Sequence, residues 1–171
     1  HEDLSLKMTE MINEEMGGRL SLAISIFMDR YEKRFLHQLI SSQLDMDRMD
    51  YLCRDCFFTG VMEGSIGAAR IIKMLNVSDD KLVVEAKGIY SIENFLVARR
   101  FMYWQVYLHK TSVAAEKMLV NILRRAKELM KSGVDLFATP ALRYFLENDV
   151  DANSFDTDYV LKRYVELDDV D

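Results

Sequence analysis

Residues 44–60 read Leu-Asp-Met-Asp-Arg-Met-Asp-Tyr-Leu-Cys-Arg-Asp-Cys-Phe-Phe-Thr-Gly. Asp45 or Asp47 can cap a helix that begins here and spans about 47–58. Side chains three and four positions apart share a helix face, so this helix carries two different stripes. The polar stripe consists of Asp47, Tyr51 and Asp55, with Arg48 beside it. The apolar stripe consists of Met49, Leu52, Cys53 and Cys56, and buried packing is expected for both cysteines.

The polar stripe has two interpretations. A carboxylate, a cation, a phenol and a second carboxylate on one side of a helix can hold a metal ion, a phosphate and a sugar. Alternatively, the helix surface carries ordinary ion pairs four residues apart, such as Asp50 with Arg54. The Cys53-Arg-Asp-Cys56 spacing favours neither a redox pair nor zinc, since a thioredoxin-like pattern and further ligands are absent from the sequence.

The rest of the chain predicts an all-α fold with one small β-hairpin near 70–87. The β-prone segments 71–77 and 81–87 flank the turn sequence Ser78-Asp79-Asp80. A stretch without Pro or Gly from 91 to 131 predicts one or two long helices. Further helices are expected at 3–16, 20–28, 31–44, 139–146 and 159–167, with an acidic loop at 148–158.

Length and composition are those of a globular domain. The chain has 171 residues, of which 50% are hydrophobic and 29% charged. No apolar run reaches the roughly 20 residues that a bilayer span needs, so no membrane association is expected. Two cysteines favour a reducing, cytoplasmic location. Because the chain starts at His1, we expect a segment of a longer protein, with a helical domain at 1–132 and a helical extension with an acidic tail at 133–171.

Charge is distributed unevenly along the chain, whose net charge is −6. Residues 147–171 carry nine acids and only two bases, whereas residues 97–132 carry eight bases and two acids. A basic segment in an acidic protein attracts phosphate, whether of a nucleotide or of a nucleic acid. The alternative is a solvated helix face that the acidic tail balances, and charge alone leaves both interpretations open.

Three blocks in this order resemble the dGTPase-like group of HD-superfamily deoxynucleoside triphosphate triphosphohydrolases. The segment 45–55 resembles the D-x-D-[KR]-x-D-Y-x-x-R-D segment of that family. His1-Glu2 is similar to its H-E pair, and the predicted hairpin falls where the family has one. The family's R-x3-H-x3-Y-x-H-K helix is matched by Arg99, Tyr103, Tyr107, His109 and Lys110, with Tyr103 in place of the usual His. The resemblance is clear over 1–110.

The resemblance implies metal-dependent hydrolysis of a deoxynucleoside triphosphate to deoxynucleoside and triphosphate. Asp47 would be one of four ligands of a divalent ion (Mg, Mn, Fe or Zn), the others being the His and the His-Asp of an H…HD motif. The resemblance also implies roles for other residues: His1 and Glu2 in catalysis at the α-phosphate, Arg48 and Arg99 on triphosphate oxygens, Tyr51 at the 2′ edge of the sugar, Asp55 at its 3′-hydroxyl, and Tyr103 and Tyr107 near the base.

One part of the family pattern is missing. The sequence contains no H…HD motif, because His37 and His109 are not followed by Asp and His1 is followed by Glu. We therefore expect this chain alone to be inactive and the longer protein to supply the motif upstream. His37 is expected to be a partly buried structural histidine.

Regulation and assembly are also implied by the resemblance. Family positions that bind an activating nucleotide between the subunits of a homo-oligomer are matched by Arg70, Lys87, His109 and Lys110. The alternative function is an inactive HD-like module that oligomerises and binds nucleotide or, as second choice, nucleic acid through 97–132.

Overall fold

A computed structural model describes residues 2–151 and 158–168. The chain divides into two compact units, one ending at His109 and one beginning at Lys110. This division falls before the last long helix, whereas the sequence placed a boundary after it, at 132/133. That predicted boundary concerns the domains of a longer protein and stays a prediction.

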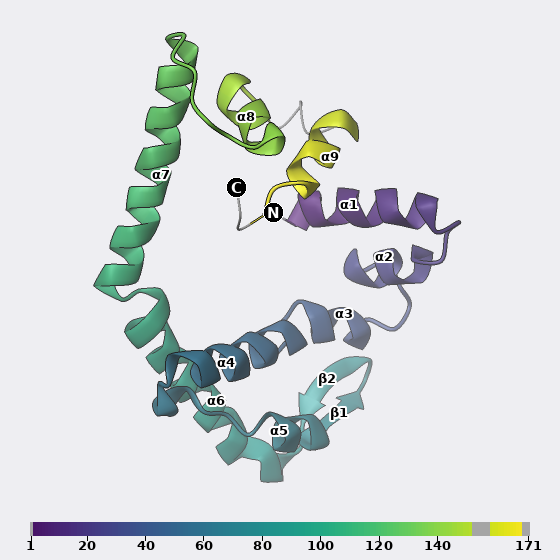
Figure 1. The fold of residues 1–171 in the computed structure, drawn as a ribbon. Helices are drawn as coiled ribbons and strands as arrows, with labels where there is room; N and C mark the ends of the chain where they lie inside the picture. Colours follow the sequence, from purple (N-terminus) through teal and green to yellow (C-terminus); the bar gives the residue numbers. More distant parts are fainter. Residues whose placement is uncertain (1, 152–157, 169–171) are drawn as a thin grey trace. The chain divides into compact units, whose positions relative to one another are not determined.

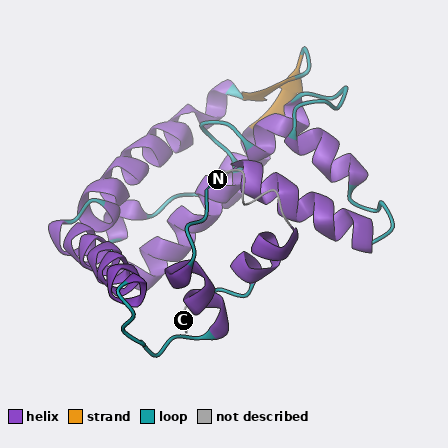
Figure 2. Cartoon of the chain, turned by 90° about the horizontal axis from the view of Figure 1, so that it is seen from above, coloured by secondary structure: helices purple, strands orange, loops and turns teal. Residues whose placement is uncertain are grey.

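The first unit is built from helices, with a small hairpin at one side of them (Figures 1 and 2). Its α-helices are α1 (Glu2–Glu15), α2 (Ser21–Phe27), α3 (Phe35–Ile40), α4 (Met46–Thr59), α5 (Ala68–Met74) and α6 (Ile89–Met102). Short 3₁₀ turns, η1 (Met62–Gly64) and η2 (Ala86–Gly88), connect them, and a π-helical turn, η3 (Tyr103–Tyr107), extends α6. The mainly helical fold with one hairpin is therefore confirmed.

Helix α4 covers the predicted range of about 47–58 with one further residue at each end, and its cap is one of the two predicted aspartates. The Asp45 side chain accepts a 2.7 Å hydrogen bond from the backbone N–H of Arg48, which identifies Asp45 as the N-cap. Gly60 ends the helix in the left-handed region, with φ of 70°, where glycine is favoured. Both caps use the residue types that satisfy the unpaired backbone groups at helix ends.

The predicted apolar stripe of α4 is wrong at one position. Met49 and Leu52 are buried and Cys56 is half-buried, its Sγ lying 3.2 Å from the Val61 carbonyl oxygen. Cys53 is exposed. Met49, Leu52 and Cys56 follow a spacing of three and four residues, so their common face points into the core and Cys53 lies at its edge.

The core of the first unit joins α4, α5 and α6. Its fully buried members form one cluster of Met49, Leu52, Ile71, Phe95 and Met102. Burying each such side chain contributes about 1.5–3 kcal/mol to folding. The cluster fixes α4 against α6, and these are the two helices that carry most of the predicted site residues.

The predicted hairpin is confirmed, but it is shorter than expected. Strands β1 (Leu75–Ser78) and β2 (Lys81–Val84) pair antiparallel, with Leu75 opposite Val84. Asp79 and Asp80 have φ of 49° and 58°, as a two-residue hairpin turn with the right twist requires. Residues 71–74 are helical instead of extended, because Ile71 is buried in the core and this packing outweighs its β-propensity.

The predicted helix at 31–44 is also shorter, since α3 covers only Phe35–Ile40. Ser41 leaves helical geometry, and the Ser42 N–H donates to the Asp45 carboxylate at 3.4 Å, so this segment serves the cap of α4. Helix α3 also covers the hairpin, because Gln38 Oε1 accepts a 2.7 Å hydrogen bond from the Leu82 N–H. His37 is half-buried with Nδ1 3.1 Å from the Ile26 carbonyl oxygen, which confirms its structural role.

The second unit contains α7 (Lys110–Lys131), α8 (Pro140–Glu147) and α9 (Asp158–Val165). Thr139 caps α8, and Gly133, with φ of 90°, follows the end of α7. The prediction of one or two long helices over 91–131 is confirmed, and α6 and α7 show that there are two. Part of the predicted acidic loop lies outside the described residues. Among the helices described, none is both long and apolar enough to cross a membrane.

The acidic tail balances part of the basic helix. Asp149 lies 3.2 Å from Lys127 Nζ and 2.5 Å from Lys131 Nζ. These two ion pairs favour the interpretation of a solvated, balanced surface at the C-terminal end of α7.

Candidate functional site

Helix α4 and the π-helical turn η3 bring four predicted substrate residues together in the first unit. The Tyr107 hydroxyl donates a 2.6 Å hydrogen bond to Asp55 Oδ2. The rings of Tyr51 and Tyr107 pack edge to face with centroids 5.9 Å apart. The rings of Tyr103 and Tyr107 do the same at 5.2 Å. We call Tyr51, Tyr103 and Tyr107 the tyrosine cluster; the sequence predicted its members but not their mutual contacts.

The backbone of η3 differs from the predicted α-helix. The Leu108 N–H donates to the Tyr103 carbonyl oxygen at 2.8 Å, five residues back, so the turn is one residue wider than an α-helical turn. Such π-turns occur frequently at functional sites. The sequence gives no signal for this turn, because its residues have ordinary helical spacing.

Tyr51 and Tyr107 stay protonated at neutral pH. Burial and a hydrogen bond with Tyr103 raise the pKa of Tyr51 to about 12, although Arg99 and Arg48 oppose this rise. Burial and the hydrogen bond to the Asp55 carboxylate raise the pKa of Tyr107 above its ordinary value. The hydroxyls of Tyr51 and Tyr107 are therefore neutral hydrogen-bonding groups and not bases.

Two arginines lie close to the cluster. The Arg99 guanidinium lies 5.7 Å from the centre of the Tyr103 ring, and its Nη1 donates a 3.1 Å hydrogen bond to Gln43 Oε1. Arg48 donates to the Asp45 carboxylate and to the Ser42 carbonyl oxygen. Sequence reasoning missed the contact of Gln43 with Arg99, since an amide in a loop carries no distinguishing pattern.

Asp47 is the predicted metal ligand that lies among the described residues. Asp47 lies exposed in the first turn of α4. Across residues 2–151 and 158–168, no three His, Cys, Asp or Glu side chains come together as metal ligands. His1 lies outside the described residues, and Glu2 begins α1 with a side chain that is also outside them. Asp47 can thus be one ligand, but these residues do not complete a metal site.

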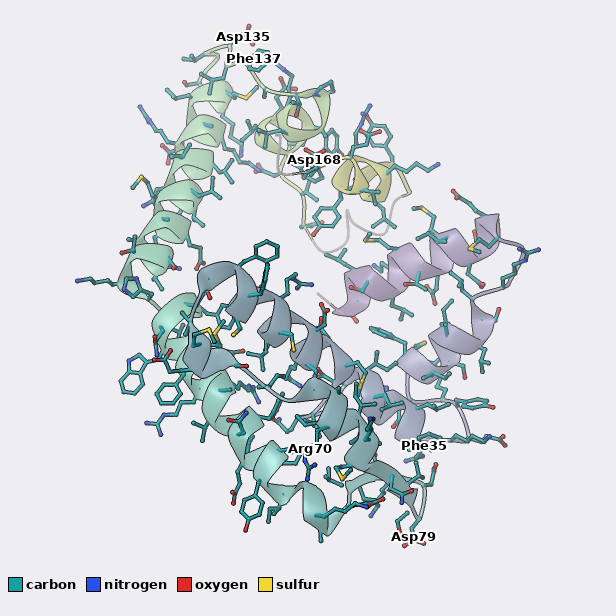
Figure 3. All side chains as sticks on the ribbon, turned by 60° about the horizontal axis from the view of Figure 1, so that its bottom comes forward. Phe35, Arg70, Asp79, Asp135, Phe137 and Asp168 are labelled. Atoms are coloured by element: carbon teal, nitrogen blue, oxygen red, sulfur yellow. The ribbon has the colours of Figure 1, made fainter. Side chains whose placement is uncertain are left out.

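The predicted regulatory positions are partly brought together. Arg70 on α5, labelled in Figure 3, donates to the carbonyl oxygen of Lys87 at 3.5 Å. Lys87 Nζ pairs with Glu85 at 2.7 Å. His109 ends the first unit, and Lys110 begins α7.

Chemically, this arrangement presents a carboxylate, three phenols and two guanidinium groups on one region of the first unit. The carboxylate accepts hydrogen bonds from hydroxyl groups, phenol rings offer apolar faces and edges, and guanidinium groups bind phosphate oxygens. Such a set can contact hydroxyl, aromatic and phosphate groups of a ligand. It contains no activated nucleophile among the described residues.

The chain is similar to several known proteins. Residues 66–141 match the family model described as HD associated region. A crystal structure of a phosphohydrolase from Bacteroides thetaiotaomicron is 65% identical, with a TM-score of 0.95 over 98% of this chain and 42% of that one. The uncharacterized protein YwfO of Bacillus subtilis is 37% identical over 81% of this chain and 30% of its own length.

A more distant relative carries a specific name. The deoxynucleoside triphosphate triphosphohydrolase SAMHD1 homolog of Dictyostelium discoideum is 24% identical over 77% of this chain and 28% of its own length. The chain therefore spans less than half the length of each of these relatives. Together the comparisons show that the chain is similar to an HD associated region, to part of a phosphohydrolase and, more distantly, to part of a protein named as a deoxynucleoside triphosphate triphosphohydrolase.

Proposed function

We propose that the full-length protein hydrolyses deoxynucleoside triphosphates to deoxynucleoside and triphosphate. One observation carries this proposal: the Asp55 carboxylate, held by Tyr107 at 2.6 Å, lies beside Tyr51 in a region that two arginines flank. The distant similarity to a named deoxynucleoside triphosphate triphosphohydrolase supports the same substrate class.

The sugar would be recognised by Asp55 and Tyr51. Tyr107 occupies Oδ2 of Asp55, so Oδ1 is the oxygen that can accept the 3′-hydroxyl. Tyr51 lies one helical turn before Asp55 on the same face of α4, so its ring can close off the 2′ edge of the same sugar. A ring at that edge favours deoxyribose, because a 2′-hydroxyl would meet it.

The phosphates would be held by Arg48 and Arg99. Both guanidinium groups act electrostatically on Tyr51, which places positive charge on the flank of the proposed sugar site. Arginine binds phosphate oxygens with paired, charge-assisted hydrogen bonds. Their contacts with Asp45 and Gln43 fix the two side chains before a ligand arrives.

Hydrolysis would need groups beyond the described residues. We propose that Asp47 joins metal ligands supplied by another part of the longer protein, and that His1 and Glu2 act near the α-phosphate. A divalent ion in such a site polarises a phosphate and activates water. A histidine suits proton transfer because its ordinary pKa lies near neutrality.

The test is product analysis with the full-length protein, dGTP and Mn²⁺. Ion chromatography should detect triphosphate and deoxyguanosine in equal amounts, and Asp47→Asn should abolish their formation. The matched control is Asp50→Asn, which changes an exposed carboxylate of α4 that pairs with Arg54. Release of phosphate or pyrophosphate alone would contradict the proposal.

A second candidate is an inactive nucleotide-binding module. It is favoured by the absence of a three-ligand metal group among the residues that the structure describes. The same experiment separates the two candidates, because the module would bind dGTP and release no product.

A further inference from the structure

We propose that one face of α7 is a docking surface for a helix from the part of the longer protein that lies outside residues 1–171. The face, which we call the α7 seam, consists of Ala115, Met118, Leu119, Ile122 and Leu123. The proposal concerns how the protein is held together and does not depend on the reaction proposed above.

The sequence of α7 has the spacing of a helix that packs against other helices. Apolar side chains recur at intervals of four, three, four and three residues, at Ala115, Leu119, Ile122, Ala126 and Leu129. This repeat places them in one row along the helix, which a neighbouring helix can bury along its length. Met118 and Leu123 widen the row on either side.

The C-terminal end of this apolar row is already covered within the second unit. Helix α8 lies beside the end of α7 (Figure 1), and Lys127 Nζ donates to the carbonyl oxygens of Phe145 and Asn148 at 3.2 and 2.7 Å. Ala126 and Leu129 are half-buried there. The row therefore continues from a part that a helix covers into the seam.

The seam itself is open among the residues that the structure describes. Met118, Leu119 and Ile122 are 62%, 57% and 57% exposed, and Leu123 is 39% exposed. Across residues 2–151 and 158–168, no residue of α7 is fully buried. Contiguous exposed apolar side chains commonly mark a surface that another molecule or segment covers.

Chain length and charge indicate what covers the seam. This chain matches only 42% of the Bacteroides phosphohydrolase, although the two are 65% identical, so more than half of that relative lies outside the match. Helix α7 carries six basic and two acidic residues, so a second copy of α7 on the seam would bring like charges together. The rest of the longer protein is therefore the occupant that both observations favour. Acidic residues beside the apolar face of the docked helix would offset the positive charge of α7.

Photo-crosslinking of the full-length protein identifies the occupant. Met118, at the edge of the seam, is replaced by benzoylphenylalanine, and the purified protein is irradiated without nucleotide and digested for mass spectrometry. The expected product links position 118 to a peptide outside residues 1–171 of the same molecule. The same group at Asn121, an exposed position on the polar face of α7, is the control and should give no such link. A link between two copies, a link only within residues 1–171, or equal yields at both positions would overturn the proposal.

Thermal unfolding tests the burial of the seam independently. In the full-length protein, Leu119→Ala should lower the melting temperature by about 5 °C, as expected when a buried leucine is truncated. Asn121→Ala should shift it by less than about 2 °C, as expected at a surface position. Light scattering should show the same mass for both variants. Equal shifts would mean that the seam stays exposed, and a fall in mass with Leu119→Ala would assign it to a second copy, so either result would overturn the proposal.

Discussion

The Tyr107 hydroxyl and the Asp55 carboxylate are joined by a 2.6 Å hydrogen bond across 52 positions of the sequence. The bond connects α4 to η3 and engages one of the two carboxylate oxygens. It leaves the second oxygen to a ligand, with Arg54 Nε 3.8 Å away. A carboxylate held in this way is already oriented before substrate binds, which lowers the entropic cost of binding.

Replacing Asp55 with alanine should reduce dGTP turnover by the full-length protein. The loss of a charge-assisted hydrogen bond costs roughly 1–3 kcal/mol, which corresponds to about a 5- to 150-fold fall in kcat/KM. Steady-state kinetics measure it, and Tyr107→Phe should give a smaller fall because the carboxylate remains. Unchanged kinetics in both variants would mean that this bond only stabilises the fold.

Alkaline pH should destabilise the first unit through the tyrosine cluster. The folded pKa of Tyr51 is raised from 10.0 to about 12, so the folded state holds this proton more tightly than the unfolded state. The resulting stability is fully present below pH 10 and is lost as the pH rises toward 12.

Denaturant unfolding at increasing pH, followed by circular dichroism, measures this loss. Tyr51→Phe should weaken the dependence between pH 10 and 12, since phenylalanine carries no titrating hydroxyl. Tyr90→Phe, on the exposed side of α6, should leave it unchanged. If stability depended equally on pH in the unmodified protein and in both variants, groups other than Tyr51 would cause the dependence.

The cap of α4 makes a third prediction. Asp45 is 5% exposed and accepts from the Arg48 N–H at 2.7 Å, so Asp45→Ala removes both the cap and the partner of the Arg48 side chain. Urea unfolding should show a loss of about 0.5–2 kcal/mol for the cap alone, and more with the ion pair. Asp50→Ala breaks an exposed pair with Arg54 and should change stability by less than about 1 kcal/mol.

The sequence predicted features that depend on neighbouring residues better than features that depend on long-range contacts. The start of α4 depends on neighbouring residues, and the sequence predicted it to within two residues by offering Asp45 or Asp47 as the cap. The conformation of residues 71–74 and the exposure of Cys53 depend on which face meets the core, and both predictions were wrong. Long-range contacts decide these features, and a local pattern does not contain them.

In the candidate site, too, the sequence predicted the residues but not their long-range contacts. The residue types on the polar stripe were readable from spacing and from the family resemblance. The bond between Asp55 and Tyr107 required α4 and η3 to meet, and the π-helical turn that presents Tyr107 has no sequence signal. The roles of Asp55 and Tyr107 in substrate binding stay predictions.

Gly64 makes a fourth prediction about the core beneath the site. A Cβ at this buried glycine would lie 2.3 Å from Sδ and 2.6 Å from Cγ of Met102, a fully buried side chain. Gly64→Ala should therefore destabilise the protein by about 1–3 kcal/mol through overpacking. Gly67→Ala is the control, since its nearest neighbour would be Arg70 Cβ at 3.9 Å. Equal unfolding midpoints for the two variants would contradict this account.

The first unit has exposed apolar side chains next to basic residues, and this surface predicts assembly of the protein. Trp104 and Leu108 are each 66% exposed, with the Arg100 guanidinium 5.6 Å from the Trp104 ring centre. Apolar side chains gathered on a surface commonly mark a binding site. Two subunits that approach through the basic segment 97–132 would repel each other unless anions lie between them.

We therefore expect dGTP to promote association of the full-length protein through Arg70, Lys87, His109 and Lys110. Light scattering should show a larger mass with dGTP than without it. The increase should be lost in Lys110→Ala and in Arg70→Ala, while Lys73→Ala, an exposed lysine of the same helix as Arg70, should retain it. The competing model is a nucleic-acid surface, whose affinity for oligonucleotides falls steeply with salt. An unchanged mass together with tight, salt-sensitive oligonucleotide binding would favour that surface, because a nucleotide between subunits must change the mass.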